Sequence, residues 1–302
     1  MQNTNHSLNY LIVGGRSEAG QSAIQAIREH HANAAARIIA TSSAADAGMD
    51  SVPGADAVIA GIDLNQPDAA ESLMQGLRNL DPDTPEPPAI DVLFFTPAFG
   101  PIGYPIRAAT VADAEEAIQF SVAPMRALAD GLKPRLTVGY SAFYWLPHAR
   151  VGYGSMSYAK VLLDTLAHEE SERFRAIRGG TFRSPATRGI GLLLQRALKT
   201  TEHLELKELG AEYKKGGGKF SDFFFKYAFS HEAQAFGEQF AQTPHRPTER
   251  DDLKQATLRI LQGEDAPVLC VIGDWVWPEN QMPDLDADVF RIKDEVLNRH
   301  GF

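Results

Sequence analysis

The chain has 302 residues, enough for one large α/β domain or two ordinary ones. Its composition, 44% hydrophobic and 23% charged, is that of a globular protein with ample material for a core. The formal net charge of −10 argues against a general binder of nucleic acids or of anionic membranes, because phosphate contacts need a basic surface.

The cysteine content and the N-terminal residues indicate a cytoplasmic protein. Cys270 is the one cysteine and cannot form a disulfide within the chain; its neighbours, PVLCVIGD, indicate a buried strand and a structural thiol. The first ten residues, MQNTNHSLNY, have neither a basic segment nor an apolar run, so we expect no signal peptide. No apolar run approaches the ~20 residues that a membrane span needs.

A strand, a glycine turn and a helix form the first predicted unit. Residues 10–13 are an apolar strand, the sequence GGRSEAG follows, and apolar residues then recur at helical spacing. Such a turn lets the backbone approach a pyrophosphate, whose charge the helix N-terminus attracts. The candidate cofactor-binding residues here are Gly14, Gly15, Arg16, Ser17 and Gly20. Glu18 occupies the middle position of the GxxxGxG frame, so an ordinary tight turn is the alternative.

The next two strands bear on which dinucleotide would bind. In NAD-binding proteins of this fold, an acidic residue at the end of the second strand hydrogen-bonds the ribose hydroxyls. Residues 36–40 form a strand without such an acid at its end. Ser42 after this strand, together with Arg16, favours a 2′-phosphate and hence NADP(H) over NAD(H); alternatively, Arg16 is a solvated turn residue. Residues 57–62 form the third strand, and Asp63 then either touches the adenine ring or caps a helix starting near Pro67.

The fourth and fifth predicted strands end in polar residues. Residues 90–95 are continuously apolar, as a strand buried on both faces should be, and Thr96 and Pro97 follow where ligands sit in open α/β sheets. Residues 111–132 predict a long helix that Pro124 should kink. The strand 135–138 precedes Ser141 and an aromatic trio, and a helix carrying Lys160 is expected over 151–168.

The rest of the sequence, after the helix that carries Lys160, predicts one domain with an insertion. We expect a loop beside the cofactor at TFRSPATRGIG, a helix at 192–198, a helix at 251–262, the last strand at 268–272 and a closing helix at 287–299. The insertion, about residues 196–248, has a glycine tip, KKGGGK, and is either a mobile substrate lid or a helical decoration or subunit contact. Strands that alternate with helices predict a single Rossmann-type α/β domain over 1–302, with a doubly wound, mostly parallel sheet.

With this order, the chain resembles the short-chain dehydrogenase/reductase family over residues 8–190 and again at the last strand. The family's common Tyr-x-x-x-Lys signature is missing, because Met156 stands four residues before Lys160. Tyr153 to Lys160 instead reads Y-x-x-M-x-x-x-K, which is similar to the branch containing the enoyl-acyl-carrier-protein reductases. The resemblance implies an NAD(P)H-dependent oxidoreductase that acts on an enoyl thioester or on a carbonyl of a small apolar metabolite. It also implies a homodimer or homotetramer.

The resemblance implies roles for the residues near Lys160. Tyr153 would polarise the substrate carbonyl, Lys160 would mainly hold cofactor, and Ser141 would bond the substrate oxygen; alternatively, Ser141 is a strand-end turn residue. The positions expected to line the substrate pocket are Phe143, Tyr144 and Met156. Two helical turns would separate Tyr153 from Lys160, about 10 Å if both are helical, so direct contact is not expected.

Three further expectations complete the sequence-based interpretation. Pro185 and Thr187 match the family's segment that contacts the nicotinamide, although at a shorter spacing. No histidine has ligand spacing with acids or cysteine, so we expect no metal site. The alternative to an enzyme is a cofactor-sensing binding protein that has lost catalysis, which Glu18 and Met156 motivate.

Overall fold

A computed structural model describes residues 8–32, 36–66, 68–81, 83 and 86–302. Within these residues the strands form one eight-stranded sheet in the order β3-β2-β1-β4-β5-β6-β7-β8. All neighbours are parallel except β7 and β8. The strands are β1 (Leu8–Val13), β2 (Ala36–Thr41), β3 (Ala57–Ile59), β4 (Val92–Phe95), β5 (Leu136–Ala142), β6 (Phe174–Gly179), β7 (Val268–Ile272) and β8 (Trp275–Glu279). This confirms the predicted Rossmann-type sheet.

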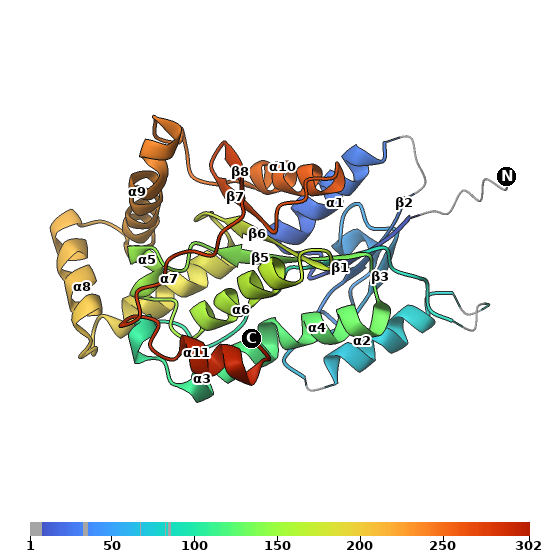
Figure 1. The fold of residues 1–302 in the computed structure, drawn as a ribbon, viewed down its shortest axis with the longest axis horizontal. Coiled ribbons are helices and arrows are strands. Elements are labelled where there is room, and N and C mark those ends of the chain that lie inside the picture. Colours follow the sequence, from blue (N-terminus) through green and yellow to red (C-terminus); the bar gives the residue numbers. More distant parts are fainter. Residues whose placement is uncertain (1–7, 33–35, 67, 82, 84–85) are drawn as a thin grey trace.

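Helices cover both faces of the sheet (Figure 1). The longer ones are α1 (Glu18–His30), α2 (Ala69–Arg78), α3 (Val111–Ser121), α4 (Ala123–Leu132), α6 (Met156–Glu169), α7 (Pro185–Ala197), α8 (Leu204–Gly216), α9 (Phe220–Phe240) and α10 (Arg250–Leu261). Shorter ones are α5 (Pro147–Arg150), α11 (Lys293–Arg299) and the 3-10 turns η1 (Met49–Ser51) and η2 (Ile106–Ala108). None of the described helices is long and apolar enough to cross a membrane.

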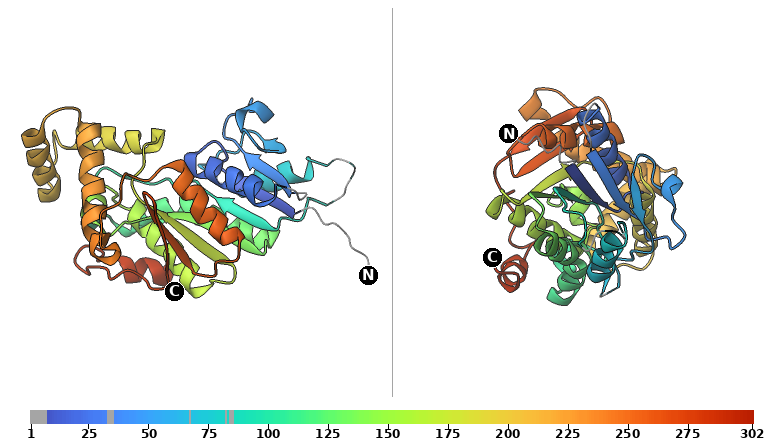
Figure 2. Two further views of the ribbon diagram at one scale, coloured as in Figure 1. Left: turned by 90° about the horizontal axis from the view of Figure 1, so that it is seen from above. Right: turned by 90° about the vertical axis from the view of Figure 1, so that its right-hand side faces the viewer.

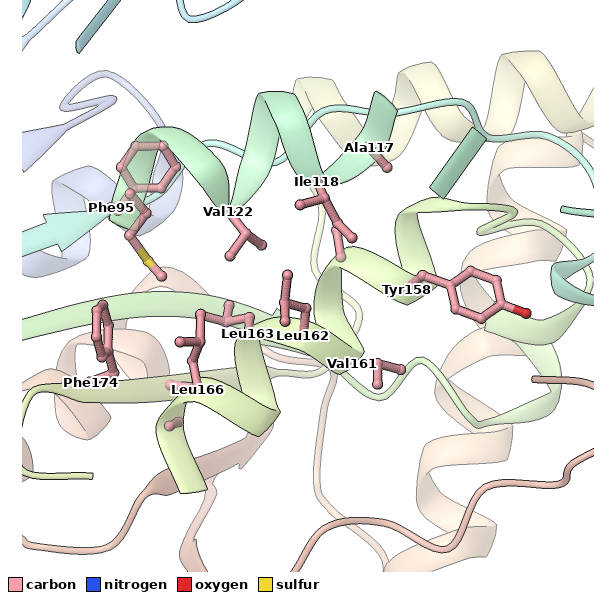
Figure 3. Close-up of a cluster of buried hydrophobic side chains, with 14 of the residues drawn as sticks. Phe95, Ala117, Ile118, Val122, Tyr158, Val161, Leu162, Leu163, Leu166 and Phe174 are labelled. Carbon is pink, nitrogen blue, oxygen red and sulfur yellow. The ribbon is translucent and has the colours of Figure 1, made fainter. Parts of the chain in front are cut away.

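The strands are apolar on both faces because each face has its own helical layer. In β1, Tyr10 and Ile12 belong to the core shared with α1 and α10, whereas Leu11 and Val13 belong to the core on the other face. That second core includes the inner sides of α2, α3, α4 and α6. Figure 3 shows part of it, where α6 packs against the helices after β4. Successive strand residues point to opposite faces, so a doubly covered strand needs an unbroken apolar run.

Several element boundaries differ from the sequence-based expectations. The expected helix over 111–132 is divided at Val122, with Pro124 in the first turn of α4, where a missing amide costs no hydrogen bond. The strand 268–272 is not the last one, because β8 turns back antiparallel along it. The segment expected as a loop, RSPATR, is the start of α7: Ser184 caps the helix and Pro185 opens it.

The insertion is helical and lies at the end of the molecule where the strands terminate (Figures 1 and 2). The N-terminal part of α9 packs with α7 and α8 around Leu206, Phe220 and Phe224. Its C-terminal part packs on the sheet edge, where Phe240 stacks on Trp275 at 4.1 Å between ring centroids and Phe236 lies against Trp277. The predicted glycine tip joins α8 to α9, and Gly217 and Gly218 there have positive φ.

A buried ion pair joins α6 to the sheet. Arg178 Nη2 of β6 lies 2.5 Å from Asp164 Oδ2 of α6, and the two side chains are 1% and 0% exposed. The Arg178 guanidinium also lies 4.7 Å from the centroid of the Trp145 ring and donates a weak bond to Cys270 Sγ at 3.4 Å. Removing one charge from such a pair leaves the other without a counterion in a medium that solvates it poorly.

Replacing Asp164 with Asn should lower the free energy of unfolding by about 3–5 kcal/mol, because Arg178 stays charged and buried without its partner. Urea denaturation of the purified variant measures this change. The matched control is the double variant Asp164→Leu with Arg178→Met, which removes both charges and should recover most of the loss. A single variant within about 1 kcal/mol of the wild type would contradict the assigned role of the pair.

Candidate functional site

The glycine turn after β1 holds the start of α1 close to the strand end. Gly14 has φ of +82°, and a Cβ there would lie 2.5 Å from Thr96 Oγ1. A Cβ on Gly20 would collide with the carbonyl oxygen of Gly14, because the first helical turn passes directly over it. Gly15 is equally tight, with Ala40 Cβ at 2.8 Å from an added Cβ. Gly20 is therefore required by close backbone packing, and Gly14 and Gly15 by the side chains of Thr96 and Ala40 that lie against them.

Hydrogen bonds fix this turn and leave donors free. Ser17 caps α1 by accepting from the Gly20 amide at 2.9 Å, and its hydroxyl lies 2.9 Å from Thr96 Oγ1. Thr96 donates to the Val13 carbonyl at 2.9 Å, which ties β4 to β1. In the described part of the chain, the amides of Arg16, Glu18 and Ala19 donate to no protein acceptor. Free amides at a helix start are suited to an anion.

The negative charge of Glu18 is compensated by a residue that the sequence analysis did not select. Its carboxylate lies 2.6 Å from Nε of Arg250, the first residue of α10. A negative charge at the start of α1 would otherwise repel a phosphate placed there. The Arg250 guanidinium compensates that charge from the neighbouring helix.

The other residues predicted to touch the adenosine half of a dinucleotide lie in different environments. Arg16 is exposed on the turn. Ser42 is buried, and its hydroxyl accepts from the Ala44 amide at 3.3 Å. Asp63 accepts from the Asn65 amide at 3.0 Å, and this bond is the main reason why the pKa of Asp63 is lowered. It thus orders the turn ahead of α2, which begins at Ala69; Pro67 lies outside the described residues.

Lys160 points from α6 to the backbone of β5. Its side chain is nearly buried, and Nζ donates to the Tyr140 carbonyl at 2.6 Å. Burial lowers the pKa of Lys160 to about 8, although the Asp164 carboxylate opposes this shift. A cavity of about 10 Å³, roughly the space of one water molecule, lies beside it and is also lined by Pro97 and Ser121.

Ser121 fastens the loop that follows β4. Its hydroxyl donates to the Phe99 carbonyl at 2.7 Å and accepts from the Phe99 amide at 2.9 Å. This pair of bonds holds the loop after Pro97 next to the cavity beside Lys160.

Tyr153 precedes α6 rather than lying on it. The helix predicted over 151–168 begins at Met156, and Tyr153 sits in the preceding turn with its amide donating to the Ala149 carbonyl at 2.9 Å. Burial, followed by the charge of Glu232, raises the pKa of Tyr153 to about 12. Among the described residues Tyr153 and Lys160 share no hydrogen bond, as expected from their spacing.

The strand-end serine has a buried hydroxyl without a hydrogen-bond partner. Ser141 lies near the end of β5, is buried, and its Oγ has no hydrogen-bond partner among the described residues. An unsatisfied buried hydroxyl is a rare feature that a substrate oxygen would resolve.

The side chains predicted to line a pocket are themselves buried. Phe143 packs on Trp277 and Phe236, and Tyr144 packs on Phe290 in the core below α6. Phe143 and Tyr144 are 2% and 0% exposed and so present almost no surface to a ligand here. Met156, 8% exposed, approaches the loop at Gly100. Contact of these three residues with substrate stays a prediction.

Tyr158 and Thr187 make structural contacts. Tyr158 is fully buried against Phe290, and Figure 3 shows its ring directed away from Leu162 and Leu166. Thr187 Oγ1 donates to the Phe182 carbonyl at 2.7 Å, which fixes the first turn of α7.

Residues that the sequence analysis did not select form a buried polar cluster between α5, α9 and the end of β6. Glu232 of α9 is 1% exposed and accepts from the amide and hydroxyl of Thr181 at 2.7 and 2.8 Å. His148 of α5 is also buried, with Nε2 3.7 Å from Glu232 Oε1. A signal existed in the sequence, because Glu232 is the acid in the aromatic stretch FFFKYAFSHEAQAF and lies three and four residues from Phe229 and Phe236. Elsewhere in the described residues, no three or more His, Cys, Asp or Glu gather as metal ligands.

Comparisons with known proteins support the fold. No protein-family model and no curated protein matches the sequence. In structure, the chain is similar to an NAD+-bound xylitol dehydrogenase, with a TM-score of 0.56 and 14% identity over 90% of this chain and 100% of that one. It is also similar to a short-chain dehydrogenase/reductase family oxidoreductase from Burkholderia thailandensis, with a TM-score of 0.54 and 17% identity over 88% and 92%. At these identities the likeness establishes that the chain has the fold of these enzymes.

Proposed function

We propose that the chain is a cytoplasmic, NADP(H)-dependent oxidoreductase of the short-chain dehydrogenase/reductase type. Its substrate is an enoyl thioester or a carbonyl of a small apolar metabolite. The observation that carries the proposal is the turn after β1, where Gly14 and Gly20 allow a close backbone approach and three amides stay free. Lys160 and Ser141 lie toward the same ends of the parallel strands, where ligands bind in open α/β sheets.

The residues of the turn fit a phosphorylated dinucleotide. The free amides of Glu18 and Ala19 would hold the pyrophosphate at the start of α1. Exposed Arg16 would pair with a 2′-phosphate, and β2 ends at Thr41 and Ser42 without an acid that would repel it. These features support NADP(H) over NAD(H).

The chemistry uses Tyr153 as a neutral donor. When bound, NADPH would supply a hydride to the electron-poor carbon of the substrate, and the residues of the site would have to stabilise negative charge on the substrate oxygen. With a pKa of about 12, the Tyr153 hydroxyl keeps its proton at neutral pH and can donate a hydrogen bond to that oxygen. Ser141 Oγ would add a second donor, and the Lys160 ammonium would hold the nicotinamide ribose.

A binding protein that senses NADP(H) without turnover is the second candidate. It was motivated by Glu18 in the glycine turn and by Met156 at the usual tyrosine position. The pairing of Glu18 with Arg250 is compatible with cofactor binding in both candidates, and the unsatisfied Ser141 hydroxyl favours the enzyme. By resemblance we further propose a homodimer or homotetramer.

Replacing Arg16 with Ala should weaken NADPH binding about tenfold and leave NADH binding unchanged, because only NADPH carries the phosphate that the guanidinium pairs with. Fluorescence titration of the purified protein with each nucleotide measures both constants. Arg299→Ala on α11 is the matched control and should bind like the wild type. Equal loss of affinity for both nucleotides would exclude a selective phosphate contact at Arg16.

Replacing Tyr153 with Phe should reduce NADPH-dependent turnover at least about 100-fold while cofactor affinity stays within about twofold, because the ring remains and only the proton donor is lost. The assay follows NADPH oxidation with crotonyl-CoA and with acetophenone as substrates. An unchanged turnover number would show that Tyr153 has no role in the reaction. If the wild type binds NADPH tightly but oxidises it with no thioester or ketone, the chain is a cofactor-sensing binding protein rather than an enzyme.

A further inference from the structure

The exposed side of α7 combines positive charge with apolar side chains. Arg188, Leu192 and Arg196 follow one another at four-residue steps, so they lie along one side of the helix. Leu192 is 49% exposed and its neighbour Leu193 is 42% exposed. The opposite side is buried, with Leu194 in the core shared with α8 and α9. Helix sides that face water usually carry polar residues, so the four exposed residues, here called the α7 face, leave an apolar surface between two cations.

The cations of the α7 face have no protein counterion. Residues 173–201 contain no acid. In the described part of the chain, neither Arg188 nor Arg196 has an ion pair or a side-chain hydrogen bond. Acids of the neighbouring helices, Glu205 of α8 and Asp222 of α9, are already paired with other arginines. In a chain of net charge −10, the α7 face is thus a local positive surface that attracts anions.

The α7 face borders the loops that enclose the proposed site. Leu193 Cβ lies 3.6 Å from where a Cβ on Gly103 would stand, in the loop that follows β4. The Leu194 side chain comes within 2.8 Å of an added Cβ on Gly152, in the turn that carries Tyr153. Gly103 also donates to the Gly152 carbonyl at 2.8 Å, which joins the loop to the turn. A substrate whose reactive end lies at Tyr153 can therefore extend along α7.

We propose that the substrate is a thioester with a phosphorylated carrier of the coenzyme A type, and that the α7 face holds this carrier. The assignment rests on the proposed function, and it selects the thioester because a small ketone has no group for this face. Arg188 and Arg196 would pair with phosphate oxygens, to which a guanidinium offers two parallel donors. Leu192 and Leu193 would contact the linker between the phosphates and the thioester. The two arginines stand about 12 Å apart along the helix axis, which suits an extended chain with several anionic groups.

Binding of coenzyme A without an acyl group tests the α7 face independently of turnover. Isothermal titration is done with saturating NADP+, which keeps coenzyme A out of the dinucleotide site. The double variant Arg188→Ala with Arg196→Ala should bind coenzyme A at least about tenfold more weakly than the wild type, and added salt should weaken wild-type binding. The matched control, Arg78→Ala with Arg299→Ala, removes two exposed arginines at the ends of α2 and α11 and should bind like the wild type.

Turnover then separates the carrier from the reacting group. With crotonyl-CoA, the α7 double variant should show a KM raised at least about tenfold and a kcat within about twofold, because the lost contacts are remote from the reacting carbon. With the crotonyl thioester of N-acetylcysteamine, which has the same acyl group and no phosphate, the variant should match the wild type.

No binding of coenzyme A by the wild type, or equal affinity and equal KM in the α7 double variant, overturns the assignment and leaves the reductase intact. Phosphatidylserine vesicles that bind the wild type but not the double variant, without coenzyme A binding, would assign the α7 face to a membrane surface and also overturn it. If coenzyme A binds at the α7 face but NADPH is oxidised with neither thioester nor ketone, the proposed reaction fails while the carrier site stands.

Discussion

The contact between the first turn of α1 and the end of β1 is the constraint on which the rest of this site depends. Gly20 lies so close over the Gly14 carbonyl that it accepts no side chain, and at Gly14 a positive φ and the Thr96 hydroxyl exclude one. Ser17 and Thr96 then lock the turn to β4 through hydroxyl contacts. The arrangement leaves amides without protein acceptors at the positive end of a helix, where an anion such as a phosphate would be stabilised.

The insertion is fixed to the sheet edge by a part of the chain outside the core Rossmann units. Helix α9 is anchored by Phe236 and Phe240 on the tryptophans of β8, and this packing fixes Glu232 at the end of β6. The antiparallel β8 thus supplies the surface on which the C-terminal part of α9 rests. The sheet provides Ser141 and the backbone partner of Lys160.

The sheet and its helical layers were predictable from sequence, since unbroken apolar runs and helical spacing are local signals. The same holds for the glycines of the turn, whereas a kink at Pro124 was expected and the chain instead divides at Val122 into two helices. Contacts between distant segments were not predictable: Arg250 reaches Glu18 from 232 positions away, and Arg178 meets Asp164 across a sheet and a helix. The expected RSPATR loop was wrong because Ser184 and Pro185 are as typical of a helix start as of a turn. Tyr153 does not lie on the expected helix because Gly154 after it has a φ of +49°, which a helix does not contain, and α6 begins only at Met156.

Hydrogen–deuterium exchange with and without saturating NADPH tests the central claim most directly, because it reports where the dinucleotide binds. The account predicts slower exchange of the amides of residues 14–20, where Arg16, Glu18 and Ala19 now lack acceptors, and of the loop after Thr96. Protection confined to other segments, or no protection at nucleotide concentrations in the millimolar range, would contradict a cofactor site at the start of α1.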